Sequence, residues 1–228
     1  MKLILTNDDG YGAPGLDALF ASAEGLGDRI TVAPHQAHSG CSHKVTTDEP
    51  IIIKEHAENA FAIVGTPADC VRVALYKIAP DAAWVLSGIN AGGNLGVDVY
   101  HSGTVAAARE AVIHGRPGIA VSHYKKKGLQ YDWAQAAAWT RPLLLEILSK
   151  PAKPGMLWNI NLPHLPAGSS KPDVVFCPLD PAPLPLSFRS ESDRLHYDGV
   201  YSQRLRSDGT DVSYCLGDRI TVTEIRLY

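Results

Sequence analysis

The chain has 228 residues, of which 45% are hydrophobic and 20% charged, and its formal net charge is -3 at pH 7. This composition is typical of an ordinary globular protein and excludes a disordered or fibrous chain. The small net charge, without any block of like charges, argues against binding to a nucleic-acid polymer or an anionic membrane as the main role.

Strand-like and helix-like segments alternate along the first two thirds of the chain. Short apolar or β-branched runs bounded by Gly, Pro, Asp or Asn predict strands at 2–6, 29–34, 83–88, 118–122 and 157–162. Periodic segments between them predict helices at 13–27, 66–79, 103–115 and 133–149. This alternation predicts an α/β fold with a mostly parallel, doubly wound sheet.

Local signals at two of the helices sharpen this prediction. Thr66 is a good N-cap, Pro67 suits the first helical position, and Asp69 favours the positive end of the helix dipole. Pro142 lies inside the fourth helical segment and predicts that this helix kinks or divides near Arg141, because proline cannot donate the backbone hydrogen bond.

Two segments depart from the alternation. Residues 44–64 contain the runs "KVTT", "IIIKE" and "FAIVG", which predict consecutive strands, hence a β-hairpin or meander added to the parallel sheet. From about residue 166 the chain becomes proline-rich, as in "PLDPAPLPLSF", which favours an extended connection, and 218–228 predicts a closing strand. We therefore divide the chain into a core, 1–165, and a C-terminal extension, 166–228.

The cysteines and the N-terminal segment indicate the cellular compartment of the protein. The four cysteines form no CxxC pair, which argues against both a structural zinc site and a disulfide framework and fits a reducing compartment. The apolar run at 3–5 is too short for a signal-peptide core, and no window approaches the ~20 apolar residues of a membrane span. We expect a soluble, unprocessed, cytoplasmic protein.

Polar side chains follow three of the predicted strands. Asp8 and Asp9 come directly after the first strand, Ser39 lies in the loop after the second, and Asn90 and Asn94 follow the strand at 83–88. Ligands of an open parallel sheet bind outside the carboxyl ends of its strands, so these loops are expected at one edge. Carboxylate, hydroxyl and amide oxygens are preferred by Mg²⁺, Mn²⁺ or Ca²⁺ over zinc. The sequence predicts a divalent-cation site with open positions for water or substrate.

A second feature is the start of the helix at 103–115. Ser102, Gly103 and Thr104 lie where free backbone N–H groups and the helix dipole bind anions. A metal beside such a helix start predicts a phosphoryl group held between them. Each element also has a structural reading: the paired acids as a turn, the serine as an N-cap, and the asparagines as left-handed turn residues.

Histidines offer weaker signals. His35, His38 and His43 flank Ser39, but loop spacing without a helix or cysteine partner is a poor indication of zinc. His101 is a candidate for contacting substrate or donating a proton, and a packed structural role is equally open.

Longer segments carry a family resemblance. "LTNDDGYGAPGL", "VAPHQAHSG", "GTPADCV", "LSGINAGGNLGVDVYHSGTVAAAREA" and "WNINLP", which span about residues 1–165, resemble the successive signature segments of the SurE (survival protein E) family of metal-dependent nucleotidases. The resemblance implies a Rossmann-like core with a C-terminal extension that exchanges between subunits. It also implies a phosphatase acting on nucleoside 5′- and 3′-monophosphates, and in some members on short polyphosphate.

The resemblance also implies roles for single residues. One divalent ion, Mg²⁺ or Mn²⁺, is expected on the residues that match the metal ligands: Asp8, Asp9, Ser39 and Asn90. The residues that match the phosphate surroundings are Asn94, Ser102, Gly103 and Thr104. His43 stands where the family usually has asparagine, so the substrate side of this loop is expected to differ.

These features support one mechanism and two alternatives. Direct attack of water on a phosphomonoester would use Asp8 or Asp9 as the base. An aspartyl-phosphate mechanism with Asp8 as nucleophile is an alternative, although that class normally places its acids two residues apart. A non-catalytic nucleotide- or metal-binding regulatory module is the other.

The C-terminal extension predicts an oligomer. A proline-rich arm that ends in a strand has little of its own to pack against, and exchange between subunits would supply partners. We expect a homodimer or homotetramer.

Overall fold

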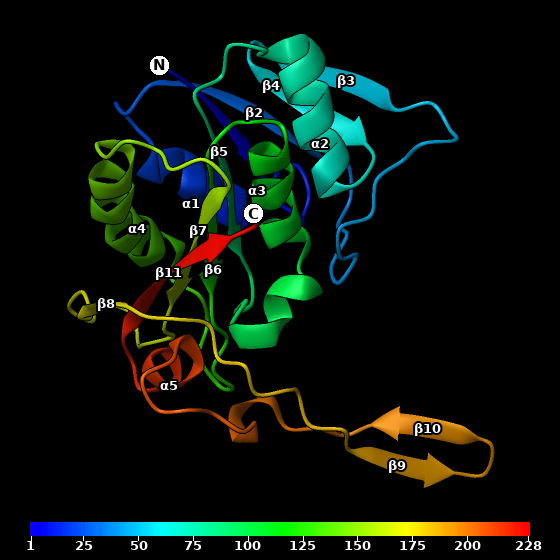
Figure 1. The fold of residues 1–228 in the computed structure, drawn as a ribbon, viewed down its shortest axis with the longest axis vertical. Helices are drawn as coiled ribbons and strands as arrows, with labels where there is room; N and C mark the ends of the chain where they lie inside the picture. The colour runs from blue at the N-terminus through cyan, green and yellow to red at the C-terminus, as the bar shows by residue number, and fades with distance from the viewer.

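The computed structural model describes residues 1–228 and contains one large mixed sheet with helices on both faces (Figure 1). Its strands are β1 (Lys2–Thr6), β2 (Asp28–Pro34), β3 (Ile52–Ala57), β4 (Ala60–Val64), β5 (Trp84–Asn90), β6 (Gly118–His123), β7 (Met156–Leu162), β8 (Val174–Phe176) and β11 (Ile220–Arg226). They lie in the order β3-β4-β2-β1-β5-β6-β7-β11-β8. A separate hairpin is formed by β9 (Phe188–Glu191) and β10 (Arg194–Tyr197).

The centre of the sheet is parallel. β1 pairs with β2 and β5, β5 with β6, and β6 with β7, all in parallel register. From β1 the sheet extends through β2 on one side and through β5 on the other, so the strand order reverses at β1. An open α/β sheet binds ligands at such a reversal. The predicted doubly wound α/β fold is confirmed.

Helices cover both faces and enclose two apolar cores. They are α1 (Pro14–Ser22), α2 (Pro67–Val73), α3 (Gly103–Ile113), α4 (Trp133–Leu148) and the short α5 (Asp211–Leu216), with 3-10 turns η2 (Gly96–Tyr100) and η3 (Tyr201–Gln203) and a π-helical turn η1 (Ala74–Ile78). α1 and α4 share one buried cluster with the sheet, which contains Leu19 and Leu144. α2 and α3 share the other, which contains Val71 and Ala107.

The start of α2 follows the predicted signals, whereas α4 does not divide. Thr66 and Asp69 form a reciprocal capping box, with Pro67 in the first turn. Of the two outcomes predicted near Arg141, a kink or a division, division does not occur, because the helix runs unbroken through Pro142. The carbonyl that loses its donor belongs to Ala138, an exposed residue, so water can replace the missing hydrogen bond.

The segment 44–64 contains two strands instead of three. β3 and β4 form the predicted hairpin, and β4 joins the sheet in parallel beside β2. The prediction of a strand at 44–47 is wrong. The backbone N–H and hydroxyl of Thr46 donate to the carboxylate of Asp69 at 2.9 and 2.7 Å, so this segment is bound by a side chain and not by a neighbouring strand.

The C-terminal segment returns to the same sheet. The predicted closing strand is confirmed as β11, which pairs antiparallel with β7 and parallel with β8. The β9–β10 hairpin instead projects away from the body, and all its strand residues are exposed (Figure 1). None of the helices has the length and apolar character needed to cross a bilayer.

Candidate active site

Asp8 lies at the carboxyl end of β1 and packs directly against the start of α3. The side chain is 5% exposed, and one of its carboxylate oxygens accepts a hydrogen bond from the Thr104 hydroxyl. A Cβ added to Gly103 would lie 2.9 Å from Asp8 Cβ, which shows how closely the helix start approaches the carboxylate. Glycine at position 103 therefore lets the two elements touch.

The loop that carries Ser39 is held against the same place. The backbone N–H of His38 donates to the Asp8 carbonyl at 2.7 Å, and the N–H of Ser42 donates to the His101 carbonyl at 3.1 Å. Ser39 lies between these two bonded residues in the sequence, so its segment is attached to the β1 loop at one end and next to the start of α3 at the other. Its side chain is exposed. The loops after β1 and β2 thus meet, as their positions at one sheet edge predict.

The loop after β5 is joined to Asp9. A carboxylate oxygen of Asp9 accepts a hydrogen bond from the backbone N–H of Ala91 at 3.0 Å. The neighbouring Asn90 donates its side-chain amide to the Gly92 carbonyl at 2.8 Å, which leaves its Oδ1 available as an acceptor or ligand. The loop that carries Asp8 and Asp9 therefore contacts both the loop that carries Ser39 and the end of β5, where Asn90 lies.

The predicted phosphate residues divide into two groups. Ser102 is the N-cap of α3 and accepts from the Val105 N–H at 3.0 Å, so its structural reading holds, and the N–H groups of Gly103 and Thr104 have no acceptor inside the helix. Asn94 is buried and does not contact the start of α3 through any of its hydrogen bonds. It donates to Ser122 Oγ at 2.7 Å, and its backbone is bound by Asn161, so it belongs to a polar network at the ends of β6 and β7.

Burial raises the pKa of Asp8 to about 6. The hydrogen bond from Thr104 opposes this effect, and the nearby charge of Asp9 adds to it. A carboxylate of this kind is costly to ionise unless a positive charge compensates it. Two adjacent acids thus lie beside the positive end of α3, and groups of these two kinds attract cations and anions, respectively.

This shift predicts a pH dependence of stability in the metal-free protein. Between its usual value of 3.8 and about 6, Asp8 is protonated in the folded chain and ionised in the unfolded chain. The folded state then binds more protons, so its free energy of unfolding falls by about 3 kcal/mol as the pH rises through this window. Urea unfolding in EDTA from pH 4 to 7 should show this decline relative to the Asp8→Asn variant. Parallel pH profiles for the two proteins would contradict it.

The histidines near Ser39 do not gather around a common point. His43 bonds Glu110 Oε2 at 2.7 Å, and no group of three His, Cys, Asp or Glu side chains is placed to hold a metal ion. The candidate cation site is of a different kind, because only two of its four residues are carboxylates. His101 is exposed at the end of η2, directly before the start of α3.

Sequence reasoning missed the partners of several charged groups. It assigned Thr104 to the phosphate but not to Asp8, and it gave no role to Glu110. Asp98 of η2 accepts hydrogen bonds from Arg204 at 2.9 Å and from the Tyr201 hydroxyl, and these contacts attach the C-terminal segment to η2. No local pattern signals these pairs, because the partners lie far apart in the chain.

Comparison with known proteins places this site in a family. The family model described as "Survival protein SurE" matches residues 3–180. The chain belongs to the SurE family. A putative 5′-nucleotidase of Nostoc sp. is 49% identical over the full length of both chains, and a protein named 5′-nucleotidase SurE of Rhizorhabdus wittichii is 43% identical over 72% of this chain and 66% of its own.

A solved structure supports the same assignment. The crystal structure of the SurE protein from Aquifex aeolicus superposes with a TM-score of 0.87 at 28% identity, covering 100% of this chain and 94% of the other. SurE similarity therefore extends beyond the signature segments and includes the C-terminal part of the fold. Membership of the family was predicted from those segments and is confirmed.

Proposed function

We propose that this chain is a 5′-nucleotidase that hydrolyses nucleoside 5′-monophosphates to nucleoside and phosphate with the help of one divalent cation. Relatives that match the whole chain or most of it are named 5′-nucleotidases, which supports a nucleotide phosphatase. The observation that carries the proposal is the contact between a buried carboxylate, Asp8, and the start of α3 at Gly103. A cation held at Asp8 would then lie beside an anion held at the helix start, as the hydrolysis of a phosphate monoester requires.

The residues present fit Mg²⁺ or Mn²⁺. Four oxygen-bearing side chains, Asp8, Asp9, Ser39 and Asn90, come from the loops after β1 and β2 and from the end of β5, and they offer the hard donors that these ions prefer. Burial raises the pKa of Asp8, and a bound cation would stabilise its ionised form. A divalent cation bound here would supply Lewis-acid polarisation of a phosphoryl oxygen.

The chain's own groups would divide the remaining work. Asp9 is less buried than Asp8 and makes one hydrogen bond, so we assign it the proton of the attacking water. The N–H groups of Gly103 and Thr104, of which the second also interacts with the Asp8 carboxylate, would hold the equatorial phosphate oxygens as negative charge develops on them. Thr104 would also keep Asp8 oriented through its hydroxyl. His101, exposed beside the helix start, is our candidate for contacting the leaving oxygen.

Removal of divalent ions should stop the reaction. We expect EDTA to abolish phosphate release from nucleoside 5′-monophosphates, and added Mg²⁺ or Mn²⁺ to restore it, because the paired carboxylates would otherwise repel the substrate phosphate. The measurement is phosphate release from a panel of 5′- and 3′-monophosphates and from short polyphosphate. Full activity in EDTA would contradict the metal site, and no release under any condition would contradict the nucleotidase.

The same panel distinguishes the alternatives. Activity on 3′-monophosphates and polyphosphate is part of our proposal and rests on the family resemblance. A trapped phosphoryl group on Asp8 would favour the aspartyl-phosphate mechanism, although the Asp8 carboxylate is buried and bound by Thr104. Tight nucleotide binding without phosphate release would favour a regulatory module.

We also propose a homodimer or homotetramer in the cytoplasm. The final strand finds its partners within its own sheet, so support for oligomerisation comes instead from the projecting β9–β10 hairpin. Its Phe188, Leu195 and Tyr197 are more than half exposed, as expected for an arm that packs on another subunit. Light scattering at micromolar concentration tests this, and a monomeric mass would contradict it. The four free cysteines support a reducing compartment.

A further inference from the structure

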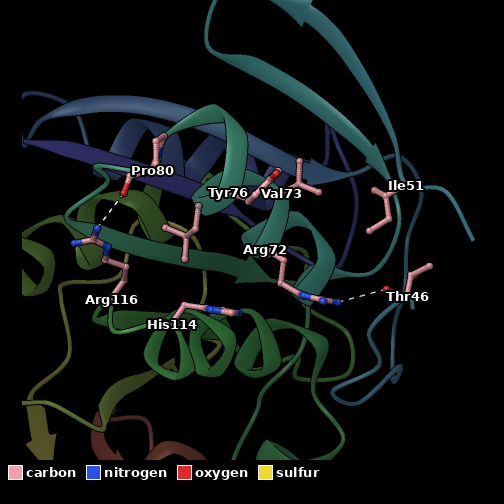
Figure 2. A pocket seen from close by; sticks show the side chains of 9 residues that line it. Thr46, Ile51, Arg72, Val73, Tyr76, Pro80, His114 and Arg116 are labelled. Carbon is pink, nitrogen blue, oxygen red and sulfur yellow. Dashed lines mark hydrogen bonds between the residues drawn. The ribbon is translucent and has the colours of Figure 1, made fainter. Parts of the chain in front are cut away.

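A cavity of about 530 Å³ lies away from the Asp8 site, between the segment 46–51, the end of α2, η1 and the end of α3. Figure 2 shows Arg116, His114 and Arg72 in a row along one wall, with Pro80, Tyr76 and Val73 on the wall above. The volume falls within the range of small-molecule sites, which run from about 300 to 1,000 Å³. No acidic residue lines the cavity.

The two arginines in this cavity keep most of their hydrogen-bonding capacity. Arg116 makes one hydrogen bond, to the Pro80 carbonyl at 3.0 Å, and Arg72 makes one long contact, to the Thr46 carbonyl at 3.4 Å. Arg72 also forms ion pairs with Asp69 and Glu110, at 3.6 and 3.7 Å, whereas Arg116 has no carboxylate partner within 4.0 Å and is the less neutralised of the two. Each guanidinium carries five donors in a planar fork that matches a carboxylate or phosphate.

The remaining surface of the cavity suits an apolar group. Ile51, Val73 and Leu75 contribute aliphatic side chains, and Tyr76, which is 87% exposed, leaves its ring free to cover a ligand. Cationic donors on one side and an apolar wall on the other are complementary to a molecule with an anionic head and an aromatic or aliphatic body.

The cavity is also linked to the loop that carries Ser39. Buried Glu110 accepts from His114 at 2.9 Å on the cavity side and from His43 at 2.7 Å on the loop side. Thr46, at the end of the same loop, lines the cavity and is anchored to Asp69. A ligand that contacts Arg72, His114 and Thr46 would therefore touch both attachments of the loop.

We propose that this cavity binds a small organic anion, an apolar or aromatic body that carries a phosphate or carboxylate, and that its occupancy orders loop 38–46. The site lies outside the residues assigned to hydrolysis. His43 makes the link through Glu110.

Binding is tested by calorimetry of the full chain with phenylphosphonate and with phenylacetate, which separate the two head groups. We expect at least one probe to bind, and the Arg72→Gln/Arg116→Gln variant to weaken binding at least about tenfold, because two charge-assisted hydrogen-bond sites are lost. Lys77→Gln is the matched control, since Lys77 is exposed on η1 and does not line the cavity. If the double variant melts at a lower temperature than the native chain, the single variant Arg116→Gln replaces it in the binding measurement.

The outcomes separate this site from the Asp8 site. Absence of binding by both probes, or equal weakening by Lys77→Gln, overturns the proposal. Binding that is lost in Asp9→Asn but kept in the double arginine variant also overturns it, because the probe would then occupy the Asp8 site. Phosphate release without probe is recorded for every variant, so failure of the proposed nucleotidase activity remains distinguishable.

The proposed effect of cavity binding on loop 38–46 is measured separately. Hydrogen exchange of segment 38–46 should slow when the probe binds to the native chain and should not slow in the double arginine variant. Binding with unchanged exchange would overturn the coupling to the loop.

Discussion

Replacing Asp9 with asparagine is expected to lower metal-dependent phosphate release from nucleoside 5′-monophosphates by about 10² to 10⁴-fold, the range for loss of a general base. The asparagine can still accept the hydrogen bond that the Ala91 N–H donates at 3.0 Å, so the loop after β5 should keep its place. What is lost is the negative charge and the basicity of the carboxylate. The measurement is kcat and KM for phosphate release at saturating Mg²⁺ or Mn²⁺.

The matched control for this variant is Asp17→Asn. Asp17 is exposed in the first turn of α1 and loses the same charge without contacting the proposed site. It should keep activity within about twofold, since surface substitutions have small effects. If Asp9→Asn were as active as Asp17→Asn, the assignment of Asp9 as ligand and base would be wrong.

The second large effect is expected from Gly103→Ala. The added methyl group would lie 2.9 Å from Asp8 Cβ and 3.0 Å from Cys41 Sγ, closer than such atoms can approach. Either Asp8 or the start of α3 must move, which separates the cation site from the anion site. We expect activity to fall by at least about a hundredfold, because misplacement near 1 Å has effects of that size, and the free energy of unfolding to fall by about 1–3 kcal/mol.

Gly128→Ala is the control for the effect of an added methyl group. Gly128 is in an exposed loop with a φ of +89°, and a Cβ there meets no atom within 4 Å. This variant should lose some stability through backbone strain but keep its activity. Loss of stability in Gly103→Ala without loss of activity would show that the contact with Asp8 does not position a catalytic group.

The sequence was sufficient to predict the order of the elements and the edge where the site lies. Strands and helices can be predicted from the spacing of their apolar residues. The two capping residues of α2, Thr66 and Asp69, are three residues apart and can also be found from the sequence. Because parallel strands end at one edge, residues as distant as Asp9 and Asn90 could be placed together before any contact was known.

Tertiary packing decided the features that depend on competition between partners. Segment 44–47 has the composition of a strand, yet the Asp69 carboxylate binds Thr46 and takes its place. Pro142 carries a helix-breaking signal, yet α4 continues because the affected carbonyl faces solvent and the packing of Leu143 and Leu144 is retained. In both cases a local preference of a few kcal/mol or less is overridden by contacts made elsewhere.

The amino-acid sequence by itself thus determined the α/β fold, the family and the polar residues that line one edge of the sheet. Only the tertiary structure decided which of those residues touch. Thr104 bonds Asp8 across 96 positions of sequence, and His43 bonds Glu110 across 67. Such pairs leave no periodic or capping signal, since their geometry is set by how α3 packs on the sheet and not by the residues adjacent to them in the chain.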